Sequence, residues 1–329
     1  MDIRSVSESG VFESATGFSK VYSVEHISDL GAMYECCRKT GADFELTGQD
    51  AFTQAHVLAR INGCDLTEAM ERFSAMEQEM GKAALTAEER LERLCGFFSC
   101  FLGRKYTADN YFLDTQDWKP AARLEGAVFL DKSVQTEAGV FLAAVIREFP
   151  EHIGKGIIFE LTEKEYVEGY EIFLNQVSNQ SVAEMLHGEY LGIEGLLPRM
   201  QRKAPELYDI LSGKQGGENH FVRTGGFFLL KAENEDALER DAAEFFREAG
   251  KQGLRLERFP IAEQKNPREV KKLFGMFGTS GSRQNSYSTL VREKEAVNLV
   301  TESQKTEEEK KRVLLEELRT LFYQGGEEE

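Results

Sequence analysis

Hydrophobic and polar residues alternate over residues 11–24, on both sides of Ala15-Thr16-Gly17. A two-residue period around a glycine predicts a β-hairpin. We expect a short helix next, capped by Ser28 and ending at Gly41, and then an extended stretch over residues 42–61.

Two amphipathic helices are predicted after this stretch. Asp65 is the expected N-cap of the first helix, and Thr86 with Glu89 forms a capping box ahead of the second. Apolar residues of the second helix recur at i, i+3, i+4 and i+7, which makes one stripe that we expect to face the core. The stripe consists of Leu91, Leu94, Cys95, Phe98, Phe101 and Leu102.

The pattern then predicts two strand-helix-strand units, after a connection over residues 103–123 that holds Trp118. The expected first unit is a strand at 124–130, a helix at 136–149 and a strand at 156–161, and the second is a strand at 221–231, a helix at 235–250 and a strand at 254–259.

A helical insert is predicted between the two units, over residues 162–211. Thr162 and Glu165 fit a second capping box, and the apolar residues that follow keep a helical spacing: Tyr166, Tyr170, Phe173, Leu174 and Val177. Beyond the second unit we expect a short helix from Pro267 and an amphipathic Lys/Glu-rich helix at 301–322.

These elements predict an α+β fold, a layered sheet and helix built from two β-α-β units of ferredoxin-like type. The expected division is an N-terminal hairpin and helical segment (1–110), a main domain with the helical insert (111–285) and a polar C-terminal helix and tail (286–329). The pattern leaves open whether the sheet is parallel or mixed.

Composition excludes several classes of protein. The 329 residues are 41% hydrophobic with only 6 prolines, which is enough to build a core. The net charge of −17 repels a phosphate backbone, so bare nucleic acid is not expected as a partner. The chain lacks both an apolar run of roughly 20 residues and a leader-like N-terminus, so we expect a cytoplasmic protein.

Motifs for catalysis and metal binding are missing from the sequence. No Gly-Lys pair is followed by Ser or Thr, as the phosphate-binding loop of nucleotide motors requires, and no nucleophile elbow is present. The five cysteines lack C-x-x-C spacing, and His187 and Glu184 supply only halves of known metal motifs. We therefore expect no cofactor, metal or catalytic residue and favour a non-enzymatic role, although the sequence leaves an enzyme open.

One glycine-rich segment, Gly275 to Arg283, is a weak candidate for binding an anion. Gly278 and Gly281 could bring backbone N–H groups to a phosphate, and Arg283 adds a positive charge. A flexible loop after the last helix explains the same glycines.

Several blocks resemble the N-terminal, non-motor domain of the large conjugation and type IV secretion ATPases of the TraC/TrbE class. The run Thr86 to Leu94 is similar to the family's "ATERLRIF" helix, and Phe18-Ser-Lys-Val-Tyr22 is similar to its "YSKTYRF" strand. Further similar blocks follow in the same order: 126–130, a helix ending at 148–150, 161–165, 220–230 and 233–238.

The resemblance implies a non-catalytic interaction module, because this sequence has no Walker motif of the motor domain. Implied partners are inner-membrane secretion components or a separate motor ATPase, with the protein peripheral at the inner membrane and able to form an oligomer. Two alternatives remain open at this point: a phosphate- or nucleotide-binding domain or enzyme that uses Gly275 to Arg283, and a mobile-element or phage accessory protein that reuses the fold.

Overall fold

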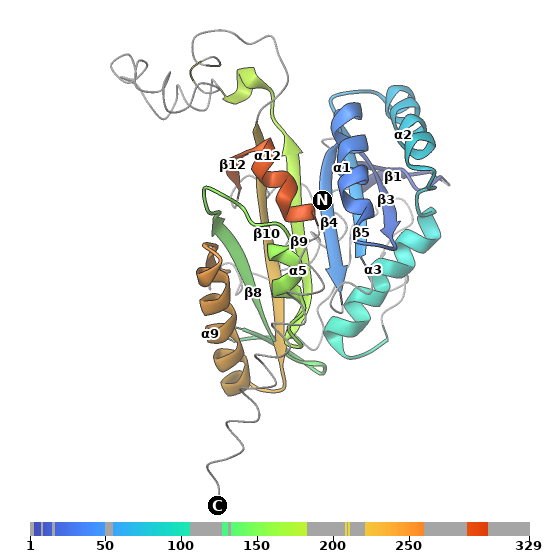
Figure 1. Cartoon of the computed structure of the whole chain (residues 1–329). Helices are drawn as coiled ribbons and strands as arrows, with labels where there is room; N and C mark the ends of the chain where they lie inside the picture. Colours follow the sequence, from blue (N-terminus) through green and yellow to red (C-terminus); the bar gives the residue numbers. More distant parts are fainter. Residues whose placement is uncertain are drawn as a thin grey trace, which may run out of the picture.

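The described residues form one large antiparallel sheet with helices packed on both of its faces (Figure 1). The computed structural model describes residues 3–7, 9–14, 17–49, 55–105, 127–130, 133–182, 208, 210, 221–259 and 288–301. Its 12 strands follow the order β1-β2-β3-β5-β4-β9-β10-β8-β7-β6, with β11 beside β8 and β12 beside β10. The protein is thus of the mixed α+β class. No helix in these described ranges is long and apolar enough to cross a membrane.

The N-terminal half contains the predicted hairpin and the predicted extended stretch. Its strands and helices are β1 (Ile3–Val6), β2 (Phe12–Ser14), β3 (Gly17–Val24), α1 (Asp29–Thr40), β4 (Asp43–Gln49), β5 (Ala55–Asn62), α2 (Leu66–Met80) and α3 (Ala87–Leu102). The hairpin is β2 paired with β3, and β4 and β5 occupy the extended stretch.

Three of the helix ends that the capping residues predict are confirmed. Asp65 accepts a hydrogen bond from the Glu68 N–H at the start of α2, and Thr86 and Glu89 form the capping box of α3. Gly41 ends α1 with a φ of 64°, in the left-handed region that glycine favours. Ser28 is at the N-cap of α1 but makes no capping hydrogen bond with its side chain, so its predicted role was wrong.

The C-terminal half adds the remaining strands around two long central ones. Its elements are β6 (Val128–Phe129), β7 (Val134–Thr136), β8 (Gly139–Glu148), α5 (Ile157–Thr162), β9 (Val167–Gln176), β10 (Phe221–Ala232), α9 (Glu235–Lys251), β11 (Arg255–Arg258), β12 (Thr289–Arg292), α12 (Glu293–Ala296) and the 3₁₀ helix η2 (Val297–Val300). The predicted second unit is confirmed as β10, α9 and β11.

The helix predicted at 136–149 was wrong, because these residues form β7 and β8. Both faces of β8 are buried: alternate residues from Val140 to Ile146 contact the core under α5 and α9, and those between them, from Phe141 to Val145, contact the core under α3. A strand buried on both faces is a continuous apolar run, which fits a helical stripe equally well.

Two further predictions in this region were also wrong. Residues 157–162 form helix α5 where a strand was predicted, and β9 begins at Val167, where the insert was predicted to be helical. Thr162 is the last residue of α5 and donates its hydroxyl to the Phe159 carbonyl, so it does not cap a new helix. The first strand-helix-strand unit is therefore β8-α5-β9, displaced along the chain from the predicted one.

Other predicted elements lie largely outside the described residues. Residues 179–182 of the insert are helical, whereas 183–207 and 211–220 lie outside. So do the helix predicted from Pro267 and all of the 301–322 helix except Thr301.

The two halves repeat one arrangement of strand, helix, strand, strand, helix. In β3-α1-β4-β5-α2 and in β8-α5-β9-β10-α9, the first strand pairs with the third and the third with the second. Their sequences match in register, since Glu25-His26-Ile27 corresponds to Glu151-His152-Ile153 and Phe44-Glu45-Leu46 to Tyr170-Glu171-Ile172. The two halves thus share one topology and two matched triplets.

The matched second strands, β4 and β9, pair with each other and join the halves into one sheet. We call this pairing the seam. Leu46 is directly opposite its matched residue Ile172, so the halves are related by an approximate two-fold axis through that pair. At one end of the seam, Asp43 accepts hydrogen bonds from the Gln176 N–H and from the Asn62 amide, at 2.9 and 2.8 Å.

Candidate functional site

The candidate anion-binding residues Gly278, Gly281 and Arg283 lie outside the described residues, as do Glu184 and His187. The described ranges contain no group of three His, Cys, Asp or Glu side chains that could hold a metal ion. The charged side chains that the fold does bring together are at the seam, one set on each face of the sheet.

On the face covered by α3, four charged residues meet at the seam. Glu45 of β4 and Glu171 of β9 are 2% and 0% exposed. Arg60 of β5 places its Nη2 3.6 Å from Glu45 Oε2, and Arg93 of α3 donates to the Thr47 hydroxyl. We call Glu45, Arg60, Arg93 and Glu171 the seam charge cluster.

Glu171 is the least compensated member of the seam charge cluster. Within the described part of the chain, neither of its carboxylate oxygens accepts a hydrogen bond. Burial, and secondly the negative charge of Glu45, raise the pKa of Glu171 well above its ordinary value, while Arg60 and Arg93 partly offset the rise. Burial therefore favours the neutral form of this carboxyl more than water does.

One of the two arginines that act on Glu171 comes from α3. Burial lowers the pKa of Arg93 to about 10, and the charges of Glu45 and Glu171 oppose that change. Arg93 is still protonated at neutral pH. Its hydrogen bond to the Thr47 hydroxyl of β4 ties α3 to the seam.

The two matched halves differ in the residues that surround their glutamates. Arg60 is opposite Asp43 across β4 and β5, and the matched position, opposite Gly169 across β9 and β10, is Leu229. The first glutamate thus has an arginine from its own half, whereas the second has a leucine there. Glu171 thus takes its compensating positive charge from outside its own half, from Arg60 of β5 and Arg93 of α3.

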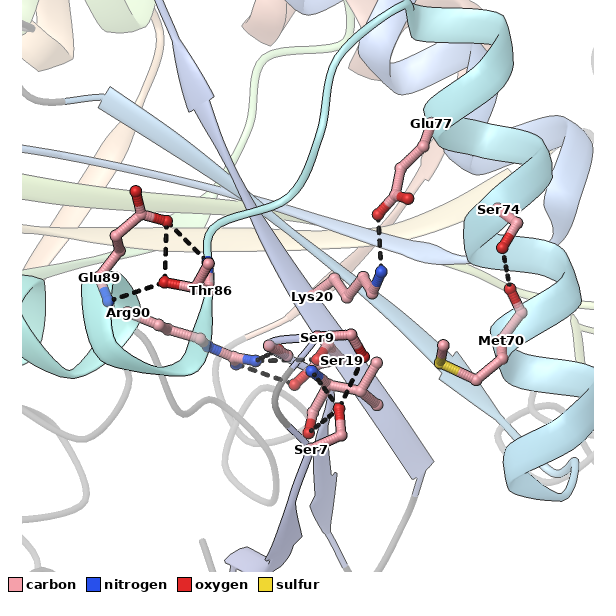
Figure 2. Close-up of polar contacts among 12 residues, drawn as sticks. Ser7, Ser9, Ser19, Lys20, Met70, Ser74, Glu77, Thr86, Glu89 and Arg90 are labelled. Atoms are coloured by element: carbon pink, nitrogen blue, oxygen red, sulfur yellow. Dashed lines mark hydrogen bonds and ion pairs between the residues drawn. The ribbon is translucent and has the colours of Figure 1, made fainter.

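Helix α3 is anchored at its first turns by a buried arginine (Figure 2). Arg90 donates to the carbonyl oxygens of Gly10 and Ser19 at 3.1 and 2.8 Å and to the Ser19 hydroxyl at 2.9 Å. Its guanidinium carbon lies 3.7 Å from the centre of the Phe12 ring. Figure 2 also shows the Thr86–Glu89 capping box and the nearby Lys20–Glu77 ion pair of 2.7 Å.

The last turns of α3 pack on the other half of the molecule. Its aromatic stripe contacts β8 and β10 and forms a second core there. One helix thus crosses from the first half to the second over the seam. The buried residues of this second core include Phe97, Phe98, Phe101, Phe141, Val145, Phe227 and Leu229.

On the opposite face, a segment from near the C-terminus lies across the two halves (Figure 1, red). We call residues 288–301 the strap. Its strand β12 pairs with the first residues of β10, α12 lies beside β10, and η2 contacts α1 and α5. Ala296, Leu299 and Val300 are fully buried in the core that α1, α2, α5 and α9 share.

Two acidic residues attach the strap to different halves. Glu293 accepts a hydrogen bond from the Tyr34 hydroxyl of α1 at 3.0 Å, and the Arg38 Nε lies 3.6 Å away. Glu295 accepts from the Ile153 N–H at 3.0 Å, beside His152 at 3.6 Å.

Two further contacts support this attachment. The Asn298 amide donates to the Ile153 carbonyl oxygen at 2.9 Å. Burial, and secondly the Glu293 charge, raise the pKa of Tyr34, so its hydroxyl stays protonated and able to donate. The surface under the strap thus offers donors for two carboxylates around an apolar centre, and we call it the strap site.

Sequence reasoning missed both arrangements at the seam. The repeated aromatic-Glu-aliphatic triplets around Glu45 and Glu171 were the available signal, since a carboxylate within an apolar strand is unusual. For the strap, residues beyond Asn285 were interpreted only as polar chain. Its partner Tyr34 is 259 residues from Glu293, so no local pattern could have shown the contact.

No protein-family model matches this chain, and no curated protein matches its sequence.

Proposed function

We propose that this chain is a non-catalytic protein-interaction module. It belongs, in this proposal, to a conjugative transfer or type IV secretion apparatus and corresponds to the N-terminal docking domain of a TraC/TrbE-class motor ATPase. The proposed partners are inner-membrane secretion components or a separate motor ATPase, which would hold a cytoplasmic protein at the inner membrane.

The ferredoxin-like layout is part of the proposal. It is supported by the strand order β11-β8-β10-β9, in which every neighbouring pair is antiparallel. It is also supported by α5 and α9, which share one core on the same face. The first half has the same order for its three central strands, so two such units would make up the sheet.

The strap carries the functional proposal. A short segment distant in sequence binds the helical face through two carboxylates and three buried apolar residues, and it contacts both halves at once. Surfaces of this kind, an apolar centre with charged residues at the rim, are typical of sites where proteins bind one another.

The test is capture of defined proteins by the tagged full-length chain. Co-encoded motor ATPase and inner-membrane components are purified separately and offered one at a time, beside an unrelated bait of similar acidic charge. We expect at least one component to be retained by the chain and not by the control bait. Retention of none would contradict the interaction function.

Two further observations distinguish the two alternative functions from this one. A thermal shift with phosphate or nucleotides that disappears in Arg283→Ala would favour the phosphate-binding domain or enzyme. Neighbouring genes that encode neither a relaxase nor a coupling protein would favour the mobile-element or phage accessory protein.

A further inference from the structure

We propose that the strap site is a binding site for an acidic helical segment of a partner protein, and that the strap is an exchangeable occupant of it. The inference deepens the interaction function proposed above and rests on it. The expected partner segment carries two carboxylates two positions apart, followed by three apolar residues, as do Glu293, Glu295, Ala296, Leu299 and Val300.

Charge complementarity defines the occupant. The strap site presents the Tyr34 hydroxyl, the Arg38 guanidinium and the Ile153 N–H, and all of these groups donate hydrogen bonds or carry positive charge. They are placed on two sides of an apolar centre, so they select a segment with acids at its start and apolar residues after it. A basic or wholly apolar segment would leave the Tyr34 hydroxyl and the Ile153 N–H without the acceptors that Glu293 and Glu295 now supply, whereas Arg38 would keep its contact with Glu35.

The strap is built in a way that permits exchange. Its helical part consists of two elements of four residues each, α12 and η2, and helices of this length are not stable by themselves in water. Its attachment to the sheet is the four-residue pairing of β12 with β10. The strap is therefore held by its contacts with the site, and a partner that offers the same contacts can replace it.

Both halves contribute residues to the strap site. Tyr34 and Arg38 are in α1 of the first half, and Ile153 precedes α5 of the second. A bound segment thus contacts both halves across the seam. Occupancy of this site would be sensed by both.

The experiment measures binding of a labelled peptide with the sequence of residues 288–301 to the full chain. In the wild-type protein the strap competes from within the same molecule, so we expect weak binding. Leu299→Asp puts a carboxylate into the apolar centre and releases the strap, so we expect binding to tighten by at least about tenfold. A second receptor, with Glu293→Ala and Glu295→Ala together, weakens the strap without changing its apolar residues and should show the same trend.

Matched controls locate the binding to this site. Tyr34→Phe in the Leu299→Asp chain removes one donor to the peptide and should weaken binding, whereas Tyr166→Phe, the same chemical change beside Phe245 of α9, should not. A peptide in which both glutamates are alanine should bind more weakly than the original.

Hydrogen exchange on the wild-type chain supplies a readout that needs no variant. If the strap leaves its site from time to time, the backbone amides of α12 and η2 should exchange their hydrogens faster than those of β10. Equal protection of the strap amides and the β10 amides would overturn the proposal. It would also be overturned if the peptide bound neither receptor variant while circular dichroism showed that both variants are folded.

A second copy of this chain is the competing occupant. A concentration-dependent dimer that Leu299→Asp abolishes would assign the strap site to self-association and overturn the proposal of a different partner. Failure of the peptide experiment would remove this site alone, because capture of secretion components can proceed through other surfaces and is measured separately.

Discussion

Glu171 provides the sharpest test of the seam charge cluster. Its carboxyl is fully buried, and burial raises its pKa well above the ordinary value near 4.5. Between those two pKa values the native state holds one proton more than the unfolded state, so raising the pH destabilises the fold. One proton corresponds to about 1.4 kcal/mol of unfolding free energy for each pH unit.

The perturbation is Glu171→Gln, which keeps the shape of the side chain and removes its titration. We expect the wild-type free energy of unfolding to fall relative to that of the variant as the pH rises above the ordinary glutamate pKa, with a slope of at most about 1.4 kcal/mol per pH unit. The glutamine amide is itself a buried polar group that needs hydrogen-bond partners, so the variant can differ from the wild type in stability at every pH. The quantity that tests the reasoning is therefore the change of unfolding free energy with pH.

The assay is urea unfolding followed by circular dichroism at pH values from 5 to 7. Glu71→Gln, on the exposed side of α2, is the matched control and should leave the slope of the wild type unchanged. Parallel curves for wild type and Glu171→Gln over this range would refute the raised pKa and the burial on which it rests.

Three further substitutions, with one control, test the packing around the seam and α3. Thr86→Ala removes half of the capping box and should cost about 1 kcal/mol in urea unfolding. Gly48→Ala would push a methyl group into the ring of Tyr170 across the seam and should cost about 1–3 kcal/mol, whereas Gly31→Ala, in α1 with open space around it, should be neutral or stabilising. Arg90→Met leaves the acceptors Ser19 and Gly10 buried without their donor, and it should lower the midpoint of thermal unfolding more than any of the others; a smaller loss than for Thr86→Ala would contradict the anchoring role.

The sequence predicted best the features that depend on near neighbours. The caps at Asp65 and Thr86 act within one helical turn, so their residue types were sufficient. The region around β8 failed because its apolar run is buried by α3 on one face and by α5 and α9 on the other, and that environment is created by distant segments. The fold class could be predicted from alternation of elements even though the first unit was misplaced.

The candidate site was less accessible to the same reasoning. Each half supplies only part of the strap site, and the strap itself is distant from both Tyr34 and Ile153 in sequence. The seam charge cluster had a visible trace in the matched triplets around Glu45 and Glu171. Recognising it required the knowledge that these two strands pair.

The course of α3 has a consequence for how the chain is made. Phe97, Phe98 and Phe101 are synthesised before Phe141 and Phe227, the residues that cover them in the folded chain. The first half therefore cannot reach its final form as an independent unit during translation. An apolar aromatic surface stays exposed until the second half has been synthesised, and in that interval a chaperone or another nascent chain can bind to it.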